Sequence, residues 1–546
     1  MSRLHRLLVL PLAALAVPAS AQAPVAAPAI PTRQPNEPLR PAYHFTPPAH
    51  WMNDPNGLVY YRGLYHLFYQ YNPDATVWGP MHWGHAVSRD LVHWQDRPIA
   101  LAPDATGMIF SGSAAVDWHN TSGLSHDGAP PLLALFTYDN PAARKAGQPS
   151  QSQGLAYSLD AGETWRKYAA NPVLRADAGQ ADFRDPKVFW HAPTKSWVMA
   201  LAVGDHAELF GSSNLARWHR LSRFGGGLGA HGGVWECPDL LPIAVEGSTR
   251  TRWVLIQSVN PGGPNGGSAT QYFVGDFNGT TFTPDPAFVR SIAAHGPRWI
   301  DWGRDNYAGV AWSDLPRTDP RTIMIGWMNN WDYGQKTPTG TWRSAMTLPR
   351  ELSLYRLGDG SMALRQRPVR EIRALERPLV TLPARNLAGA STVAVPGESV
   401  SRAHIELSFA PAPASHQRGD RTVEQPRRSL HLQLRRPDER LCQRSHAFRR
   451  GRFRARFRLD RPGPARERQP GGPHVVLYRH HQRRGVPRPW HHRDDHRAVP
   501  ARALYAPAGV CPWRPGQADI IPGPRHRGAI GARRGQQRSG HPRNRC

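Results

Sequence analysis

The sequence predicts an all-β fold whose main part is a β-propeller, and three observations support this prediction. Short runs of alternating apolar and polar residues, broken by turn residues, fill the stretch from residue 43 to about residue 354. The chain contains 50 glycines, 54 prolines and 19 tryptophans, which favours a loop-rich, aromatic-lined protein over a helical bundle. A polar turn followed by an aromatic residue recurs four times in the same stretch.

The alternating runs are typical of β-strands. Residues 64–71 (LYHLFYQY) and 197–203 (WVMALAV) are rich in aromatic and aliphatic side chains and are bounded by glycine, asparagine or aspartate. No convincing amphipathic helix is found between residues 43 and 354, so we expect strands throughout that stretch.

The recurring turn indicates a repeated structural unit. It is found at residues 88–94, 158–165, 213–218 and 276–282, where a polar turn delivers an aromatic residue to the next strand. The spacings of 71, 53 and 64 residues between these aromatic residues suit a four-stranded propeller blade with long loops. About 310 residues would hold five blades, although unrelated hairpins of a β-sandwich remain the alternative.

The formal net charge of +27 is concentrated at one end of the chain. Residues 411–546 contain 32 arginines, no lysine and 9 acidic residues, whereas the preceding residues carry a net charge of only +4. A nucleic-acid partner is therefore not predicted. Four cysteines in 546 residues, with no C-x-x-C spacing, exclude a disulfide-stapled scaffold and a zinc knuckle.

Residues 1–21 resemble a secretory signal peptide. Arg3 and Arg6 precede an apolar run at residues 7–17, and Ala19-Ser20-Ala21 forms a small-residue cleavage site. An N-terminal anchor or a buried helix is the alternative, but the run is shorter than the roughly 20 residues that a membrane span needs. We therefore expect a secreted or periplasmic protein with no membrane span.

Three acidic motifs are candidates for chemistry. Asp54 lies in WMNDPNG at residues 51–57, Asp185 in FRDP at residues 183–186, and Glu236 in WECPD at residues 235–239. Each acid alone is more simply a turn residue or a solvated surface group. Prolines and aromatic residues flank all three, however, and the acids fall on different candidate blades. Acids on different blades can meet at the mouth of a propeller's axial channel.

Taken together, the motifs resemble the three signature motifs of glycoside hydrolase family 32, the invertase, inulinase and levanase family. Further matches are Gln70 within FYQYNP, Trp78, FSGS at residues 110–113 and WMNNW at residues 327–331. The resemblance covers roughly residues 43–410. It implies a five-bladed β-propeller followed by a β-sandwich, and retaining hydrolysis of β-fructofuranosides.

The resemblance also implies a role for each acid. Asp54 would be the nucleophile, Glu236 the general acid and base, and Asp185 the stabiliser of the transition state. A retaining pair needs carboxyl groups about 5–5.5 Å apart. We expect the neighbouring carboxylates and an apolar wall formed by Trp235 to keep Glu236 protonated, and Arg184 to keep Asp185 anionic.

The same resemblance implies the residues that would bind the sugar. Asn53, Gln70, Ser111 and Arg184 would hold the hydroxyl groups, and four aromatic residues would line the furanose ring, namely Trp51, Trp78, Phe110 and Trp331. Core packing is the alternative for any single aromatic residue. Neither a metal nor an organic cofactor is required.

The implied substrate is a fructose-containing oligosaccharide or polysaccharide. The segment YHFTPPAH at residues 43–50 looks more like exported levanases and exo-inulinases than intracellular sucrose hydrolases. We therefore favour an exo-acting fructanase that also accepts sucrose. A fructosyltransferase on the same fold and a non-catalytic fructan-binding protein are the alternatives.

The expected domain order follows from these segments. After the signal peptide come a linker at residues 22–40, the propeller at residues 41–355, a second linker at 356–385 and the start of a sandwich at 386–411. Residues 412–546 form an arginine-, proline- and histidine-rich tail.

The tail does not resemble a sandwich, because it offers too little apolar surface to offset the entropy of an ordered chain. Our hypothesis is that a frameshift in a GC-rich gene disrupted the sandwich after about residue 411, leaving the tail disordered. A true basic tail that binds polyanions is the alternative.

Overall fold

The computed structural model describes residues 33, 37, 39–378, 380–384 and 402–408, and the backbone of four short strands beyond residue 430. The chain divides into two compact units, residues 1–508 and 509–546, and every described residue belongs to the first unit. The predicted signal peptide and most of the predicted linker at 22–40 lie outside the described residues.

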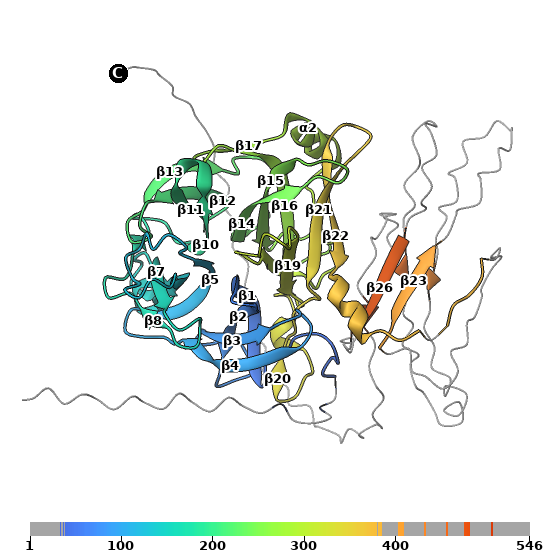
Figure 1. Ribbon diagram of the computed structural model, residues 1–546, viewed down its shortest axis with the longest axis horizontal. Coiled ribbons are helices and arrows are strands. Elements are labelled where there is room, and N and C mark those ends of the chain that lie inside the picture. Colours follow the sequence, from blue (N-terminus) through green and yellow to red (C-terminus); the bar gives the residue numbers. More distant parts are fainter. Residues whose placement is uncertain are drawn as a thin grey trace, which may run out of the picture. The chain divides into compact units, whose positions relative to one another are not determined.

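Five mainly antiparallel sheets follow one another along the chain (Figure 1). The first two sheets contain β1 (His50–Tyr61), β2 (Leu64–Asn72), β3 (His82–Ser88), β4 (Trp94–Leu101) and β20 (Trp342–Arg343), then β5 (Met108–Val116), β6 (Leu132–Asp139), β7 (Gln151–Ser158), β8 (Arg166–Lys167) and β9 (Leu174–Arg175). The third and fourth sheets contain β10 (Phe183–His191), β11 (Ser196–Val203), β12 (His206–Ser212) and β13 (His219–Phe224), then β14 (Val234–Ala244), β15 (Thr251–Asn260), β16 (Ala269–Phe277) and β17 (Phe282–Pro284). The fifth sheet contains β18 (Tyr307–Ala311), β19 (Thr322–Trp327), β21 (Arg350–Arg356) and β22 (Met362–Pro368).

The first strands of the five sheets form a closed ring. β1 contacts β5, β5 contacts β10, β10 contacts β14, β14 contacts β18, and β18 contacts β1 again. In Figure 1 the labels of β1, β5, β10 and β14 surround a common centre, while β4, β8 and β13 lie toward the outside. The predicted five-bladed β-propeller is thus confirmed.

The recurring sequence motif is the hairpin between the third and fourth strands of four blades. Residues 88–94 join β3 to β4, 158–165 join β7 to β8, 213–218 join β12 to β13, and 276–282 join β16 to β17. Each begins with a polar turn, and its aromatic residue lies at or directly before the outer strand, as the sequence predicted.

The polar residue of each motif closes its turn through a side-chain hydrogen bond. The Oδ1 atoms of four residues accept backbone N–H groups two to four residues further along, namely Asp90, Asp160, Asn214 and Asn278. The indole N–H of Trp94, Trp165 and Trp218 donates to the carbonyl three residues earlier. An Asx turn needs only its Asp or Asn residue, so the other residues of the motif can vary. The sequence similarity between the four motifs is therefore weak, although the turn itself is found in all four blades.

The hydrophobic core lies between neighbouring blades. One cluster joins side chains of the third, fourth and fifth blades, including Val198, Phe273 and Leu354. Others join the first and fifth blades, the second and third, and the first and second. Because each sheet covers the next, the apolar faces are buried without a central hydrophobic plug.

The ring is closed by a short strand of the first sheet, which comes from the chain segment between β19 and β21 of the last blade. β20 pairs in parallel with the start of β1, and the N–H of His50 donates to the carbonyl of Thr341 at 2.8 Å. Trp342 is 2% exposed, and the guanidinium of Arg40 lies 4.7 Å from the centre of its ring. The N-terminal segment therefore packs over the junction between the first and last blades.

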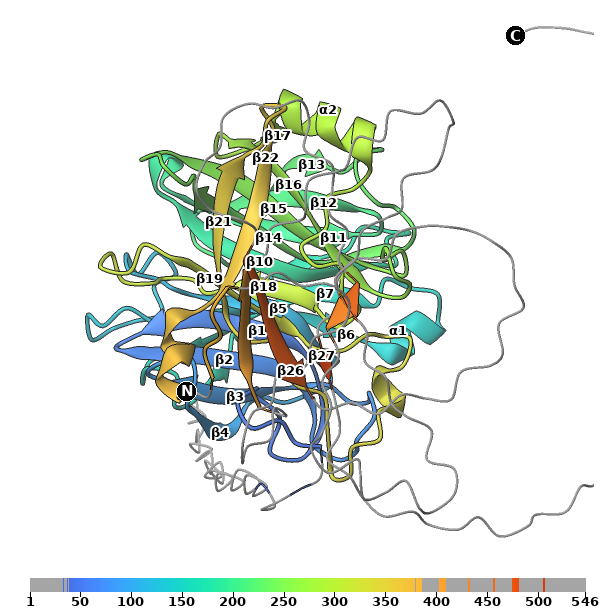
Figure 2. The same ribbon diagram turned by 90° about the vertical axis from the view of Figure 1, so that its right-hand side faces the viewer.

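A helix in the fourth blade was not expected. α2 (Pro286–His295) follows β17 and lies beside the outer part of that blade in both ribbon views (Figure 2). Asp285 caps it by accepting the N–H groups of Ala287 and Phe288, and Phe288 and Ile292 pack into the core. The Asp-Pro start was a helix signal, but ten residues are too few for a clear period. In the described part of the chain, the other helical turns are α1 (Pro141–Lys145), η1 (Ala192–Thr194), η2 (Gly334–Lys336) and η3 (Arg370–Leu375).

The propeller also extends further along the chain than expected. The predicted boundary at residue 355 falls within β21, and β22 completes the fifth blade as far as Pro368. The sequence of β22, MALRQRP, looks like a linker because most of its side chains are at least partly exposed on the outer strand of the blade. An outer strand buries too little surface to carry a clear apolar pattern.

Two small sheets are described after residue 384. β23 (His404–Ser408), β26 (His474–His480) and β27 (Leu504–Tyr505) form one, and β24 (His431–Leu432) and β25 (Ala455–Arg456) form the other. β23 lies within residues 386–411, where the start of a sandwich was expected, and the sandwich itself stays a prediction. β24 to β27 are strands within the tail that was expected to be disordered; the rest of that tail lies outside the described residues.

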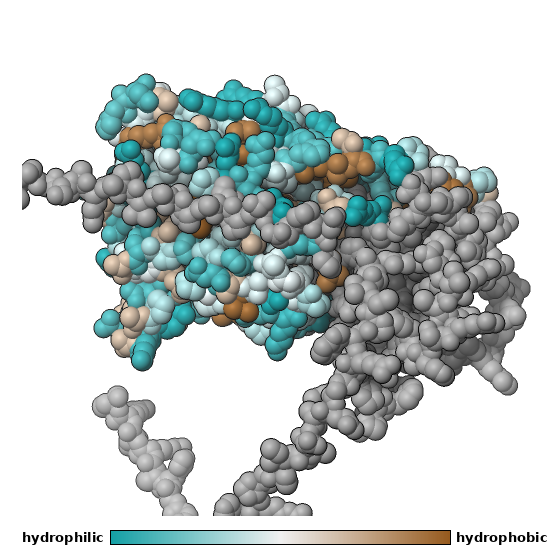
Figure 3. All heavy atoms as spheres, turned by 90° about the horizontal axis from the view of Figure 1, so that it is seen from below, coloured by the Kyte–Doolittle hydropathy of each residue, from teal (hydrophilic) through white to brown (hydrophobic). Residues whose placement is uncertain are grey.

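The surface of the described part is mixed in polarity. Figure 3 shows hydrophobic residues scattered among hydrophilic ones on one face. Scattered exposed apolar side chains are ordinary in globular proteins and indicate no particular contact site. Among the described residues, no helix has both the length and the apolar character that a membrane crossing requires.

The closure of the ring predicts an unequal effect of two tryptophan substitutions. Trp342→Ala should lower the free energy of unfolding by about 3–5 kcal/mol, because it empties a buried site at the junction of two blades. Trp118→Ala, at a side chain that is 57% exposed, should cost no more than about 1 kcal/mol. Urea denaturation followed by tryptophan fluorescence measures both, and equal losses would contradict the role given to β20.

Candidate active site

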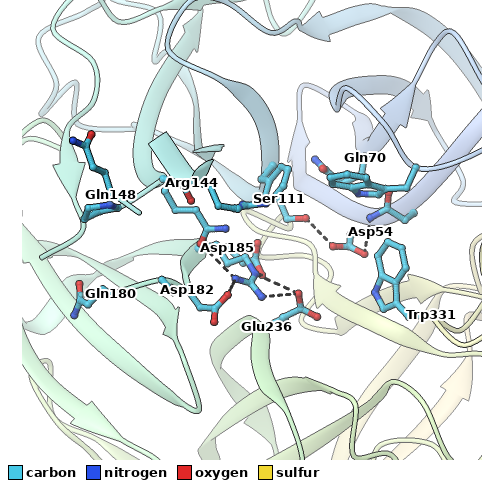
Figure 4. A pocket seen from close by; sticks show the side chains of 18 of the residues that line it. Asp54, Gln70, Ser111, Arg144, Gln148, Gln180, Asp182, Asp185, Glu236 and Trp331 are labelled. Atoms are coloured by element: carbon cyan, nitrogen blue, oxygen red, sulfur yellow. Dashed lines mark hydrogen bonds and ion pairs between the residues drawn. The ribbon is translucent and has the colours of Figure 1, made fainter. Parts of the chain in front are cut away.

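The three acids of the sequence motifs lie on the innermost strands of three blades. Asp54 is on β1, Asp185 on β10 and Glu236 on β14. All three line one cavity of about 590 Å³. Figure 4 shows Asp185 and Glu236 near the middle of this cavity, with Asp54 to one side.

An irregularity in each inner strand turns side chains toward the cavity. The pairing register with the neighbouring strand shifts at five corresponding places, namely Met52/Pro55, Ile109/Gly112, Arg184/Lys187, Glu236/Asp239 and Tyr307/Val310. A β-bulge bends its strand and redirects the side chains beside it. The same bulge on all five inner strands therefore gathers side chains at one end of the axis.

Proline marks three of the five bulges, and these carry the acids. Pro55, Pro186 and Pro238 follow directly after bulge residues and cannot donate a ladder hydrogen bond. Asp185 and Cys237 have φ angles of 63° and 47°, in the left-handed region that non-glycine residues rarely adopt. Backbone strain of this kind persists where the surrounding structure enforces it.

Of the eleven residues expected at the site, the structure brings ten together. The residues that line the cavity are Asn53, Asp54, Gln70, Trp78, Phe110, Ser111, Arg184, Asp185, Glu236 and Trp331. The rings of Trp78 and Phe110 meet edge to face, with their centres 6.0 Å apart. The cavity thus has aromatic walls as well as charged groups.

Trp51 lies elsewhere than expected. It is fully buried behind the cavity wall, with its ring centre 5.9 Å from that of Trp327 and 6.0 Å from that of Trp331. Its indole N–H donates to Oδ1 of Asn53 at 2.8 Å, so it supports the wall. Trp51 precedes the bulge of β1, and its side chain therefore packs against the fifth blade.

Asp54 is held by hydrogen-bond donors. Ser111 donates to Oδ2 at 2.8 Å and Asn53 donates to Oδ1 at 3.1 Å, while the thiol of Cys237 lies 3.7 Å from Oδ2. Burial nevertheless raises the pKa of Asp54 to about 6, and the charge of Glu236 adds to the rise. The donors oppose this rise without cancelling it.

Asp185 is also held by hydrogen-bond donors, and burial also raises its pKa. Its Oδ2 accepts the backbone N–H of Cys237 at 3.0 Å, and the thiol of the same residue lies 3.6 Å away. Burial raises the pKa of Asp185 to about 7; Arg184 lowers the pKa, whereas Glu236 and Asp54 raise it further. Arg184 was expected to keep Asp185 anionic, but its nearest nitrogen is 3.9 Å away.

The guanidinium of Arg184 instead binds Glu236. Its Nη2 and Nε donate to Oε1 of Glu236 at 3.0 and 3.3 Å, and its Nη1 contacts Asp182 and Gln151. The other oxygen of Glu236 accepts the hydroxyl of Tyr307. Polar groups therefore hold both carboxyl oxygens.

Trp235 does not form the expected wall beside Glu236. It is fully buried in the core shared by the third, fourth and fifth blades, and its indole N–H donates to the carbonyl of Ala230. Successive side chains of a strand point to opposite faces. When Glu236 faces the cavity, its neighbour Trp235 must therefore face the core.

Two loops form a polar rim on the side of the cavity away from Asp54. Residues 140–150 join β6 to β7 and contribute Arg144 and Gln148, and residues 176–182 join β9 to β10 and contribute Gln180 and Asp182. Figure 4 shows Gln148 and Gln180 on the opposite side of Asp185 from Asp54 and Trp331.

Sequence reasoning missed Tyr307, Gln151 and the four rim residues. The rim residues follow no motif, so only the tertiary structure reveals them. Tyr307 lies at the bulge of the fifth inner strand, but neither an acid nor a proline marks this bulge in the sequence. Among the described residues, no group of histidine, cysteine and acidic side chains could hold a metal ion.

A family model now identifies this arrangement. The N-terminal domain of the glycosyl hydrolases family 32 matches residues 44–368, which span the five blades and the whole cavity. The chain belongs to family 32. The match ends at the last residue of β22, in agreement with the extent of the propeller.

Similar family 32 proteins come from bacteria and fungi. A levanase from Bacillus subtilis is 48% identical over 381 residues, which cover 70% of this chain and 54% of that protein. An extracellular exo-inulinase from Aspergillus awamori is 44% identical over 398 residues, which cover 68% of this chain and 73% of that protein. The match thus spans about half the length of the levanase.

Solved structures agree with the fold. The crystal structure of the Aspergillus awamori exo-inulinase has a TM-score of 0.56 and 45% identity, and the match covers 61% of this chain and 68% of that one. A fructofuranosidase from Schwanniomyces occidentalis in complex with fructose has a TM-score of 0.56 and 40% identity, with 61% and 64% covered.

The raised pKa of Asp185 predicts a stability effect that depends on pH. A carboxyl group whose folded pKa lies above its unfolded value favours the folded state at low pH, and this contribution is lost as the pH rises through about 7. Asp185→Asn should therefore stabilise the protein at pH 8 by on the order of 2–4 kcal/mol and change little at pH 4. Thermal unfolding at both pH values measures this.

A matched control is Asp276→Asn, because the side chain of Asp276 is 72% exposed. It should show no gain at pH 8. A loss of stability in Asp185→Asn at pH 8 would show that the carboxylate is needed to hold the bulges together.

Proposed function

We propose that this protein is a secreted, retaining fructan hydrolase that releases terminal fructose from β-fructofuranosides such as levan, inulin and sucrose. The observation that carries the proposal is the convergence of three carboxyl groups in one aromatic-walled cavity of a family 32 propeller. The names of the levanase and the exo-inulinase support a fructan as the substrate.

In the first step Asp54 attacks the anomeric carbon of the terminal fructosyl unit. The bond between that carbon and the glycosidic oxygen breaks, and the proton of Glu236 moves to the leaving oxygen. The product is a fructosyl ester of Asp54 and a free saccharide. The hydrogen bonds from Ser111 and Asn53 orient the Asp54 oxygens for this attack.

In the second step water hydrolyses the ester. Glu236 is now ionised and takes a proton from the water while the oxygen of that water attacks the anomeric carbon. The bond between this carbon and Asp54 breaks, and Asp54 leaves as a carboxylate. Asp185 accepts hydrogen bonds from fructose hydroxyls, and these bonds strengthen as positive charge develops on the ring. Fructose is released, and both acids return to their starting protonation states.

The remaining predicted residues hold the sugar. Asn53, Gln70, Ser111 and Arg184 offer donors and acceptors to its hydroxyl groups, while Trp78, Phe110 and Trp331 cover its apolar faces. The cavity accommodates the reaction without a cofactor in this scheme, because every proton is moved by a carboxyl group of the chain itself.

The polar rim favours a substrate longer than a disaccharide. If the terminal fructose occupies the end near Asp54 and Trp331, the leaving saccharide extends past Glu236 toward Gln148 and Gln180. A fructan cannot easily enter a cell, which agrees with the extracellular description of the exo-inulinase and with the signal-like residues 1–21.

The first test compares the unmodified protein with Asp54→Ala. The protein should release fructose from levan, inulin and sucrose, and the substitution should lower the rate about 10³-fold or more, because no nucleophile remains. Chromatography of the products measures this. Asp205→Ala, at a side chain that is 69% exposed, is the control and should keep full activity.

Each other outcome has a distinct meaning. Saccharides longer than the substrate among the products would indicate a fructosyltransferase, and a folded protein that binds fructan without releasing fructose would be a binding protein. An active Asp54→Ala variant would rule out Asp54 as the nucleophile.

A second test uses the pH dependence of kcat/KM. Because Asp54 must be ionised to attack and its pKa is about 6, activity should fall as the pH drops below this range. Ser111→Ala removes the donor to Oδ2, so it should move the acid limb to higher pH and lower kcat/KM about tenfold. An unmoved acid limb would show that Asp54 does not control it.

A further inference from the structure

Both side-chain oxygens of Glu236 are engaged, but by different kinds of donor. Oε1 accepts two N–H groups of Arg184, at 3.0 and 3.3 Å. Oε2 accepts a single O–H group, that of Tyr307. Tyr307 belongs to none of the acidic motifs and comes from β18, the inner strand of the fifth blade.

Tyr307 is held firmly in this position. Its side chain is 1% exposed, it packs in the core between the first and fifth blades, and its ring centre lies 6.5 Å from that of Trp327. It lies at the bulge of β18, directly before Ala308, whose φ angle is 52°. Burial raises the pKa of the Tyr307 phenol well above its usual range, so the hydroxyl remains a donor.

The two sets of donors distinguish the two oxygens of Glu236 chemically. A carboxylate oxygen has two lone pairs, and the two N–H groups of Arg184 occupy both on Oε1. Tyr307 occupies one lone pair of Oε2 and leaves the other free. A proton that can be passed to a substrate therefore has room only on Oε2.

We propose that Tyr307 is a positioning residue that, given the function proposed above, fixes Oε2 of Glu236 as the oxygen that gives and takes the proton. In the first step Oε2–H loses its proton to the leaving oxygen while the bond from that oxygen to the anomeric carbon breaks. In the second step the same oxygen receives a proton from water. Tyr307 keeps its own proton throughout and acts only through its hydrogen bond to Glu236.

The hydrogen bond from Tyr307 also affects the pH dependence. Its O–H stabilises the ionised carboxyl group more than the protonated one. The other charged or titratable groups around Glu236 are Arg184 and Asp185 on β10, Asp54 on β1 and Cys237 on β14. Because Tyr307→Phe removes none of these groups, we expect the change in the pH profile to report on the hydroxyl of Tyr307.

The test is Tyr307→Phe, which removes the hydroxyl and keeps the buried ring. The variant should lower kcat/KM about 10²-fold for sucrose and levan, whose leaving oxygens need protonation. It should lower kcat/KM less than tenfold for an aryl β-fructofuranoside, whose phenolate leaves without a proton. The alkaline limb of its pH profile should move to higher pH, because the ionised carboxyl group of Glu236 loses the hydrogen bond that stabilised it.

The control is Tyr138→Phe. Tyr138 lies on β6 of the second blade and is 2% exposed, its hydroxyl donates to Asp104, and neither residue lines the cavity. This variant should leave both the ratio of the two kcat/KM values and the alkaline limb unchanged. The ratio within one variant does not depend on how much of the protein is folded, so partial misfolding cannot imitate the expected result.

Two outcomes would overturn the inference while leaving the proposed function intact. One is an equal loss on sucrose and on the aryl fructoside, which would make Tyr307 a structural residue only. The other is an unmoved alkaline limb. A folded but inactive unmodified protein would instead refute the proposed function, and the inference with it.

Discussion

The rest of the site depends on one feature: the carboxyl groups of Asp54, Asp185 and Glu236 lie in one cavity, beside the guanidinium of Arg184. Burial and mutual repulsion raise the pKa values of Asp54 and Asp185 to about 6 and 7, although donors and Arg184 oppose the rise. A fold that only needed stability would not place acids there. Apolar clusters that join neighbouring blades stabilise the propeller, and this stability offsets the free-energy cost of burying the acids. Enclosure also strengthens every electrostatic interaction within the cavity, which is what proton transfer and charge stabilisation need.

The bulges connect this constraint to the backbone. A regular inner strand would alternate its side chains between the two neighbouring blades and would direct few of them along the axis. A register shift at the same level of all five inner strands redirects side chains from every blade toward one end. The ring must then be closed accurately, because the relative positions of Asp54, Glu236 and Tyr307 depend on the packing of the first, fourth and fifth blades. The parallel pairing of β20 with β1 provides that closure.

Three different blades contribute the side chains around the carboxyl group of Glu236. The third blade contributes Arg184, the fourth contributes Glu236 itself, and the fifth contributes Tyr307. A cation on one oxygen and a neutral donor on the other make the two oxygens unequal, although the carboxyl group is symmetric. In the proposed reaction this inequality decides where the proton resides. The rim loops of the second and third blades lie on the side of the cavity away from Asp54.

The sequence by itself predicted the blade architecture and the three acids that meet in the cavity. Asx turns and the Asp-Pro and Cys-Pro bulges act over a few residues, so their signals are local and readable in the chain. The sequence did not reveal that Arg184 binds Glu236 rather than Asp185, that Trp51 and Trp235 lie in the core, or that Tyr307 donates a hydrogen bond to Glu236. It also missed α2 and β22, whose patterns are short or partly exposed. Only the tertiary structure decided the partners of Arg184 and Tyr307 and the position of Trp51, because each depends on contacts between blades that are distant in the sequence. Periodicity within one strand carries no information about such contacts.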